Sequence, residues 1–196
     1  EIGIDPGYRL LNQVEQWILL KKNLFRLELK YFRPLGNPSK FLGILINYFS
    51  KLKDEYISPA DYAAYASGLP ETDHPAQAEI REKQMELAYA YKAYQDLLME
   101  NNAMDFGDLV YHTLQLFEKR SSVLLEYQKR FQYLMVDEFQ DTNYAQTRLV
   151  LMLARKSGNL VVVGDDDQSI YRWRGASLSN IVEFEKMFGD AEKVVL

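Results

Sequence analysis

The sequence contains no cysteine and only 2 histidines, and this scarcity excludes several classes of site. Without cysteine the chain can form neither disulfides nor thiolate-based zinc sites. His74 and His112 are too far apart and too isolated to suggest a metal site or a Ser-His-Asp triad. No apolar run is long enough to span a bilayer, and no signal-peptide pattern occurs. We therefore expect a cytoplasmic protein with no membrane partner.

Positive charge is also scarce, because 28 acidic residues outnumber 23 Lys and Arg residues and leave a net charge of −5. Taken alone, this balance argues against nucleic-acid binding, since phosphate contacts usually leave a basic footprint. The acids are partly grouped in two clusters, however, where a bound metal ion would offset them. The net charge is therefore a weak objection to a nucleic-acid partner. A chain of 196 residues, 47% of them hydrophobic, is enough for one or two domains with a real core.

Two apolar runs end abruptly in acidic residues. Residues 133–136 lead into Asp137 and Glu138, and residues 160–163 lead through a glycine into Asp165. Each run is typical of a buried strand that delivers carboxylates to the edge of a parallel sheet, where ligands of open α/β sheets bind. Adjacent acids there suit Mg²⁺, which is usually held by one or two carboxylates together with substrate phosphates.

About the first hundred residues show helical spacing and no strand pattern. Helix starts are predicted at Asp5, Asn37 and Ser58, because each can cap a helix and is followed by proline. A loop rich in Gly, Pro and Asp at 68–75 precedes a long helix predicted over 76–100. The buried face of this helix is predicted to include Leu87, Tyr91, Tyr94 and Leu98.

The pattern changes after residue 104, where strands begin to alternate with helices. Asp105 is expected to cap the first of these helices, and a short helix follows at 123–130. The alternation implies a parallel sheet with right-handed crossovers, so the chain as a whole is predicted to be α/β with an all-helical first part. The expected strands are 133–137, 160–164 and 193–196, and the expected helices between them are 144–156 and 178–188.

The segments VDEFQDTN, residues 136–143, and VVVGDDDQSIYRWRGA, residues 161–176, resemble motifs II and III of superfamily 1 DNA helicases of the UvrD/Rep/PcrA type. The combination is far more specific than either acidic cluster alone. The resemblance implies that residues 104–196 are part of a first RecA-like (P-loop NTPase) motor domain, preceded by a helical insertion subdomain, 1–103. It also implies ATP and Mg²⁺ as cofactors, single-stranded or partly duplex DNA as a partner, and 3′ to 5′ translocation in repair, replication or recombination.

The resemblance also implies roles for single residues of the two motifs. Asp137 would organise Mg²⁺, Glu138 would polarise the attacking water, and Gln168 would reach the γ-phosphate of ATP. Phosphoryl transfer needs neutralised charge and an in-line nucleophile, and a neutral amide can both donate to phosphate and accept from water. Gln140 and Asp141 would link the nucleotide state to neighbouring segments. The structural alternative is a solvated acidic turn, with Asp141 or the next threonine capping the following helix.

Aromatic and guanidinium side chains alternate just beyond the motif III glutamine. Bases of single-stranded DNA stack on aromatic faces for about 1–3 kcal/mol each, largely regardless of sequence. By the resemblance, Trp173 would stack on DNA and Tyr171 would lie close by. Arg174 would contact DNA or hold the loop by a salt bridge. The alternative for the two aromatic residues is packing under the loop.

Phe106 lies in MDFGDLV, residues 104–110, which resembles the DFDDL segment of the family. The phenylalanine of that segment is part of the DNA path in relatives, whereas a hydrophobic contact at a helix start is the structural alternative. The family's second aspartate is Gly107 here, so any role of that carboxylate is lost or displaced. The glycine is also expected to loosen the first helical turn.

Two parts of such a motor are missing from the sequence. No GxxxxGK[ST] phosphate loop occurs, and neither do the motifs of a second motor domain. With no initial methionine and a bare apolar run at the end, we expect an excerpt of a longer helicase chain that is inactive without the rest. The alternatives are the helicase part of a helicase–nuclease and a DNA-binding module that has lost motor activity. Metal-dependent nucleotidyl transfer is disfavoured because it leaves residues 168–176 unexplained.

Overall fold

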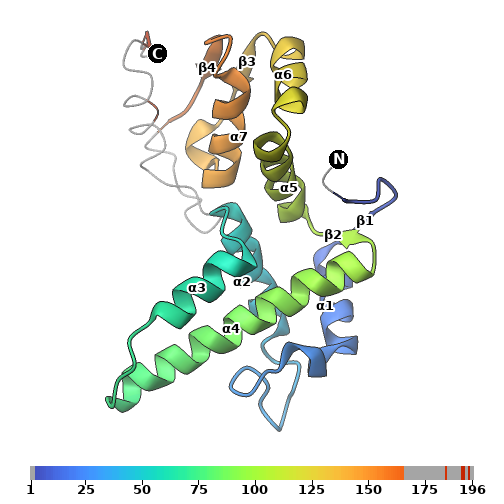
Figure 1. The fold of residues 1–196 in the computed structure, drawn as a ribbon, viewed down its shortest axis with the longest axis vertical. Helices are drawn as coiled ribbons and strands as arrows, with labels where there is room; N and C mark the ends of the chain where they lie inside the picture. Colours follow the sequence, from blue (N-terminus) through green and yellow to red (C-terminus); the bar gives the residue numbers. More distant parts are fainter. Residues whose placement is uncertain (1–2, 166–183, 185–190, 193, 195–196) are drawn as a thin grey trace. The chain divides into compact units, whose positions relative to one another are not determined.

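The computed structural model describes residues 3–165, 184, 191–192 and 194 (Figure 1). The chain divides into two compact units, Gly3–Leu109 and a second that begins at Val110. Within the described residues the fold is α/β, mostly helical, with two small parallel sheets. None of the described helices is both long and apolar enough to cross a membrane.

The first unit, called the helical unit below, follows several of the predicted start and stop signals. Ser58 begins a helix as predicted, since its Oγ accepts the Asp61 N–H while the Asp61 carboxylate accepts the Ser58 N–H. The predicted loop and long helix are also confirmed. The elements of this unit are β1 Arg9–Leu10, α1 Gln13–Lys22, η1 Leu24–Leu27, α2 Leu42–Asp54, α3 Pro59–Gly68, α4 Pro75–Glu100, β2 Ala103–Met104 and the first turn of α5 Phe106–Lys119.

The beginning of the chain differs from the prediction. Asp5 accepts the N–H of Gly7 within a turn, so it does not begin a helix. Helix α1 begins later, after Asn12, whose side chain forms a capping box with Glu15. The start predicted at Asn37 likewise leads into turns that precede α2. The prediction of an all-helical first part was also wrong, because β1 pairs in parallel with β2; strands of two residues carry no alternating pattern that a sequence reading could detect.

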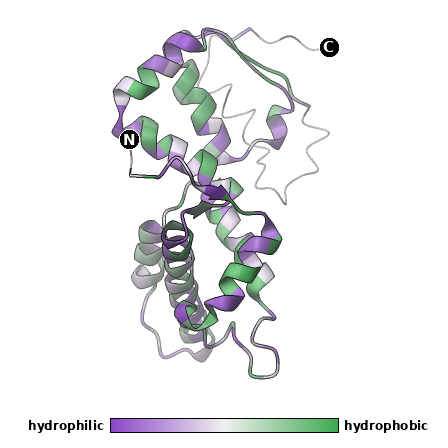
Figure 2. Cartoon of the chain, turned by 90° about the vertical axis from the view of Figure 1, so that its right-hand side faces the viewer, coloured by the Kyte–Doolittle hydropathy of each residue, from purple (hydrophilic) through white to green (hydrophobic). Residues whose placement is uncertain are grey.

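The core of the helical unit contains an aromatic stack. Phe49 of α2 stacks against Tyr91 and Tyr94 of α4, with ring centroids 5.2 and 5.4 Å apart. Together with Leu87 and Leu98, these tyrosines are buried, which confirms the predicted face of α4. Figure 2 shows that the helices carry both apolar and polar residues, as expected for helices that bury one side.

The second unit contains the strands that end in acids. Strand β3 pairs in parallel with β4, with Leu134 opposite Leu160, so the predicted parallel pairing is confirmed. The prediction that these strands are buried does not hold within the described residues, because Met135 is 80% and Val161 is 51% exposed. Most of the predicted helix 178–188 and strand 193–196 lies outside the described residues. After α5, the elements are α6 Ser121–Arg130, β3 Leu134–Val136, η2 Phe139–Asp141, α7 Tyr144–Ala154 and β4 Leu160–Val162.

Candidate nucleotide and DNA site

The acids that follow the two strands, Asp137 and Asp165, lie at the same edge of the β3–β4 sheet. The last residues of the two strands are opposite each other, Asp137 follows β3 directly, and Asp165 follows shortly after β4. A hydrogen bond from the Phe139 N–H to the Val163 carbonyl, 2.9 Å long, continues the contact beyond the strands. The described part of motif III, residues 161–165, therefore lies beside motif II.

The turn after β3 has an unusual backbone. Glu138 has a φ of 50°, in the left-handed region that residues other than glycine rarely adopt. Its N–H donates to Oδ1 of Asp137 over 2.9 Å, and both residues are solvent-exposed. Backbone strain of this kind clusters at functional sites. The turn presents two adjacent carboxylates to solvent at the end of the strand.

A buried glutamine connects the two clusters. Gln140 is 2% exposed, and its Nε2 donates to Oε2 of Glu138 over 2.6 Å. The Oε1 of the same amide accepts the Asp165 N–H over 3.0 Å. One side chain thus contacts the Glu138 carboxylate and the backbone at the start of the GDDDQ segment. Such a contact suits the linking role that the sequence predicts for Gln140.

Helix α7, which follows this turn, is capped by Asn143 and not by Asp141 or Thr142, the residues considered from the sequence. Oδ1 of Asn143 accepts the Gln146 N–H over 2.9 Å, and Oε1 of Gln146 accepts the Asn143 N–H over 3.1 Å. Neither Asp141 nor Thr142 caps α7, so capping does not explain the acidic motif. Oδ1 of Asp141 is buried and has no hydrogen-bond partner among the described residues.

The donor set at this edge fits Mg²⁺ only when other ligands join it. Asp137 supplies an exposed carboxylate with one oxygen engaged by the Glu138 N–H. The described residues include no group of three or more acidic or histidine side chains that could hold a metal. Mg²⁺ is commonly bound by one or two carboxylates plus substrate phosphates. The site therefore fits an ion that binds together with a nucleotide.

Four of the predicted site residues lie outside the described residues. They are Gln168, Tyr171, Trp173 and Arg174. Their predicted contacts with the γ-phosphate and with DNA stay predictions. The described part of motif III ends at Asp165, where the Gln140 amide contacts it.

Phe106, the fourth predicted DNA contact, belongs to the helical unit. It is the first residue of α5, and 63% of it is exposed, which does not support the alternative of a hydrophobic contact at the helix start. Asp105 caps this helix as predicted, because its Oδ1 accepts the Asp108 N–H over 2.9 Å. In return, Oδ2 of Asp108 accepts the Asp105 N–H over 3.0 Å.

A buried ion-pair cluster adjoins this turn, and the sequence analysis missed it. Nζ of Lys53 lies 2.6 Å from Oδ2 of Asp105 and 2.7 Å from Oδ1 of Asp108, and the lysine side chain is 0% exposed. Burial by itself raises the pKa of Asp105, but Lys53, the Tyr94 hydroxyl and the Asp108 N–H together hold that pKa below its usual range. Lys53, Asp105 and Asp108 are together called the Lys53 cluster below.

A sequence signal for the Lys53 cluster existed. Lys53 follows Leu45 and Phe49 at four-residue spacing, so it falls on the apolar stripe of α2. A lysine on such a stripe either extends to solvent or meets a buried acid. Only the fold shows which acid lies within reach.

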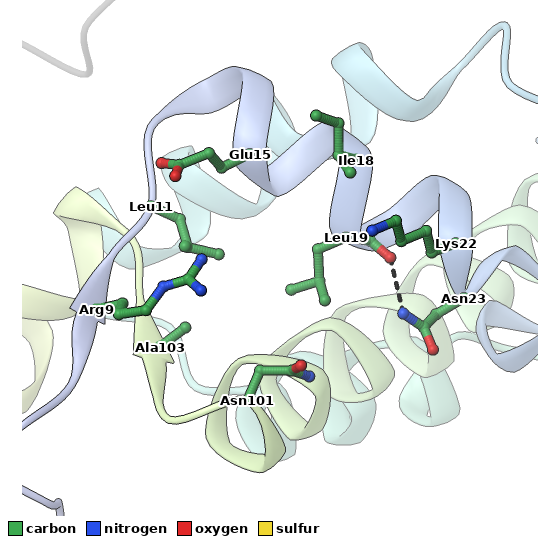
Figure 3. Close-up of a pocket in the computed structure, with 9 residues that line it drawn as sticks. All are labelled: Arg9, Leu11, Glu15, Ile18, Leu19, Lys22, Asn23, Asn101 and Ala103. Atoms are coloured by element: carbon green, nitrogen blue, oxygen red, sulfur yellow. Dashed lines mark hydrogen bonds between the residues drawn. The ribbon is translucent and has the colours of Figure 1, made fainter.

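The helical unit also contains a pocket of about 290 Å³ (Figure 3). Arg9, Leu11 and Leu19 point into it, and Nδ2 of Asn23 donates to the Leu19 carbonyl over 2.9 Å at one side. None of the predicted site residues lines this pocket, so it is separate from the strand-end acids.

Comparison with known proteins places this chain in a family. Residues 2–189 match the family model described as UvrD/REP helicase N-terminal domain. The chain is 41% identical to the ATP-dependent DNA helicase PcrA of Staphylococcus aureus and 38% identical to that of Leuconostoc citreum, in each case over 100% of its own length. It spans 24% of the length of each of these relatives. With nearly all of its residues matched, the chain belongs to the UvrD/REP helicase N-terminal domain family.

Proposed function

We propose that this chain works as part of an ATP-dependent DNA helicase that couples Mg²⁺-ATP hydrolysis to movement on single-stranded DNA. The observation that carries the proposal is the shared sheet edge, where Gln140 contacts both Glu138 and Asp165. The names of the relatives, ATP-dependent DNA helicases of about four times this length, support extending the activity to the whole protein. The rest of the helicase chain is thus a required partner.

The proposed domain division is a helical insertion, 1–103, followed by part of a RecA-like motor domain, 104–196. The parallel β3–α7–β4 arrangement supports the second assignment, because RecA-like sheets are built from such units. The two compact units of the structure divide at Leu109, within α5 and close to the proposed boundary.

In this proposal the strand-end acids divide the work of phosphoryl transfer. Bound Mg²⁺ supplies charge neutralisation at the phosphates. Asp137 holds the ion through its exposed carboxylate, and Glu138 orients the attacking water and draws its proton. The left-handed backbone and the hydrogen bond from Gln140 fix the Glu138 carboxylate for this task. Gln168 contacts the γ-phosphate and detects its loss.

DNA contacts are assigned to aromatic and cationic side chains in both units. Trp173 and Tyr171 stack on bases and Arg174 binds the strand, while Phe106 presents an exposed ring from the helical unit. Translocation runs from 3′ to 5′, on single-stranded or partly duplex DNA, in repair, replication or recombination. The protein acts in the cytoplasm.

The test is ATP hydrolysis by the full-length protein with and without single-stranded DNA. We expect DNA to stimulate turnover and Glu138→Gln to lower kcat by at least about 100-fold, the usual size of a lost general base. Glu126→Gln is the matched control, because Glu126 lies exposed on α6 of the same unit. Absence of turnover, combined with tight DNA binding that falls on Trp173→Ala, would instead identify a DNA-binding module without motor activity.

A further inference from the structure

We infer that the Lys53 cluster, with Gly107, is a positioning device that fixes the exposed ring of Phe106 for contact with single-stranded DNA. The inference rests on the proposed function, which assigns Phe106 to the DNA path. It goes beyond that function by giving Lys53, a residue far from Phe106 in the sequence, a role in DNA binding.

Every carboxylate oxygen of the cluster has a donor. Oδ2 of Asp105 accepts from Lys53 and from the Tyr94 hydroxyl at 2.6 and 2.8 Å, and its Oδ1 accepts the Asp108 N–H. Oδ1 of Asp108 contacts Lys53 and also accepts from Nε2 of Gln95 at 2.8 Å, and its Oδ2 accepts the Asp105 N–H. Buried carboxylates whose oxygens all have donors are held rigidly in one arrangement. At the edge of the cluster, the buried Oε1 of Gln95 has no hydrogen-bond partner among the described residues.

Stability alone is a weak explanation for this cluster. Two carboxylates face one ammonium, so the buried group has a net negative charge, offset in part by the amino-terminal end of α5. Burying charges costs much of what their attraction returns, and well-packed apolar side chains often stabilise as well or better. What the cluster does provide is a unique backbone position for residues 105–108.

Gly107 is part of the same arrangement. A Cβ atom at this position would lie 3.1 Å from Cδ and 3.2 Å from Cβ of Lys53, tighter than most real contacts. It would also lie 3.3 Å from Oδ1 of Asp105. Gly107 was expected from the sequence to loosen this turn. In the structure, it allows the side chain of Lys53 to pass close to the backbone.

The result is an exposed ring on a rigid base. Phe106 is 63% exposed, whereas Asp105 on one side is 4% and Asp108 on the other is 0% exposed. The fixed backbone prevents the ring from turning into the core, although burial would be favourable for it. A ring that is already held in place loses less conformational freedom when a base stacks on it.

The experiment is a double-mutant cycle in the full-length protein, measured as the Kd for a fluorescein-labelled oligo-dT and as DNA-stimulated ATPase. We expect Phe106→Ala to raise the Kd about tenfold, the size of one lost base stack. Gly107→Ala and Lys53→Met should each raise it at least about threefold, and add almost nothing once Phe106 is alanine.

Two controls separate positioning from a general loss of stability. Leu45→Ala creates a cavity in the core of the same helix α2 and should lower Tm without changing the Kd. Lys92→Met removes a lysine whose ion pair with Asp96 is exposed, and should change neither. Should Lys53→Met fail to fold, Gly107→Ala carries the test.

The outcomes distinguish this inference from the proposed function. Equal effects of Gly107→Ala with and without Phe106, or no effect of Gly107→Ala at all, would overturn positioning while leaving a DNA-stimulated ATPase. An unchanged Kd in Phe106→Ala, with stimulation intact, would overturn it as well. A full-length protein that shows neither DNA binding nor stimulation would overturn the helicase function itself and this inference with it.

Discussion

The two units of the chain use their apolar residues differently. The cluster of buried hydrophobic residues that runs from Leu11 to Ala103 lies within the helical unit. In the second unit, by contrast, strand β3 leaves Met135 80% exposed, and Tyr133 just before it is 78% exposed. The helical unit is therefore stabilised by side-chain packing, whereas the described strands of the second unit depend mainly on the backbone hydrogen bonds between β3 and β4.

Carboxylates show the same contrast. In the helical unit, Asp105 and Asp108 are buried and paired with a lysine, so their charges determine structure. In the second unit, Asp137 and Glu138 are exposed at a strand end, where a ligand can reach them. The same residue type thus serves architecture in one unit and is available for chemistry in the other.

The largest expected difference is the response of the two units to truncation of an apolar side chain. Phe49→Ala removes a fully buried ring stacked on Tyr91 and Tyr94, and should cost about 3–5 kcal/mol. Met135→Ala changes a side chain on the exposed face of β3 and should cost less than about 0.5 kcal/mol. Urea unfolding of the chain, followed by circular dichroism, measures both. Similar losses for the two variants would show that the outer face of β3 is packed after all.

A smaller effect is expected from removing the connection between the two acidic clusters. Gln140→Leu keeps the buried volume but deletes the hydrogen bonds to Glu138 and to the Asp165 N–H. We expect about a tenfold lower kcat for ATP in the full-length protein, the equivalent of about 1.4 kcal/mol, with little change in KM. Gln132→Leu, at an exposed position just before β3 in the same unit, is the matched control. A fall in stability with unchanged kcat would reduce Gln140 to a packing role.

Sequence reasoning succeeded where one local signal decided the outcome. The start at Ser58, the buried face of α4 and the cap at Asp105 each depend on residues within a few positions of one another. It failed at Asp5, where a plausible cap precedes a turn, and at β1, whose two residues pair with a segment more than ninety positions away. Such pairing depends on the tertiary fold, which local patterns do not encode.

The candidate site likewise has a part that local sequence predicts and a part that depends on the tertiary fold. The acids Asp137 and Glu138 are recognisable from the motif that contains them, and the strand-end position predicted for them is confirmed. The contact between Gln140 and Asp165 could be predicted only from the register of two strands. The Lys53 cluster could be predicted only from the packing of α2 against the start of α5. Long-range hydrogen bonds between polar side chains are the part of a site that spacing along the chain cannot supply.

The smallest expected effect concerns an acid that opposes the stability of the helical unit. Asp54, half-buried at the end of α2, has its pKa raised from 3.8 to about 6, first by desolvation and then by the charges of Glu55 and Asp105. The folded state therefore holds this proton more tightly than the unfolded state. The resulting contribution to stability is complete below about pH 3.8 and is lost as the pH rises through about 6.

Asp54→Asn should remove the loss of stability that the parent shows as the pH rises through about 6. A shift of this size corresponds to about 3 kcal/mol for a fully buried group, but solvent screening of a half-exposed carboxyl reduces the expected gain to about 1 kcal/mol at pH 7. At pH 4 the variant and the parent should be nearly equal, since the folded parent is then largely uncharged at this position. Urea unfolding at the two pH values measures the difference, with Asp73→Asn in the exposed loop before α4 as control. Equal stability of Asp54→Asn and parent at pH 7 would mean that the Asp54 carboxylate is well solvated in the folded helical unit.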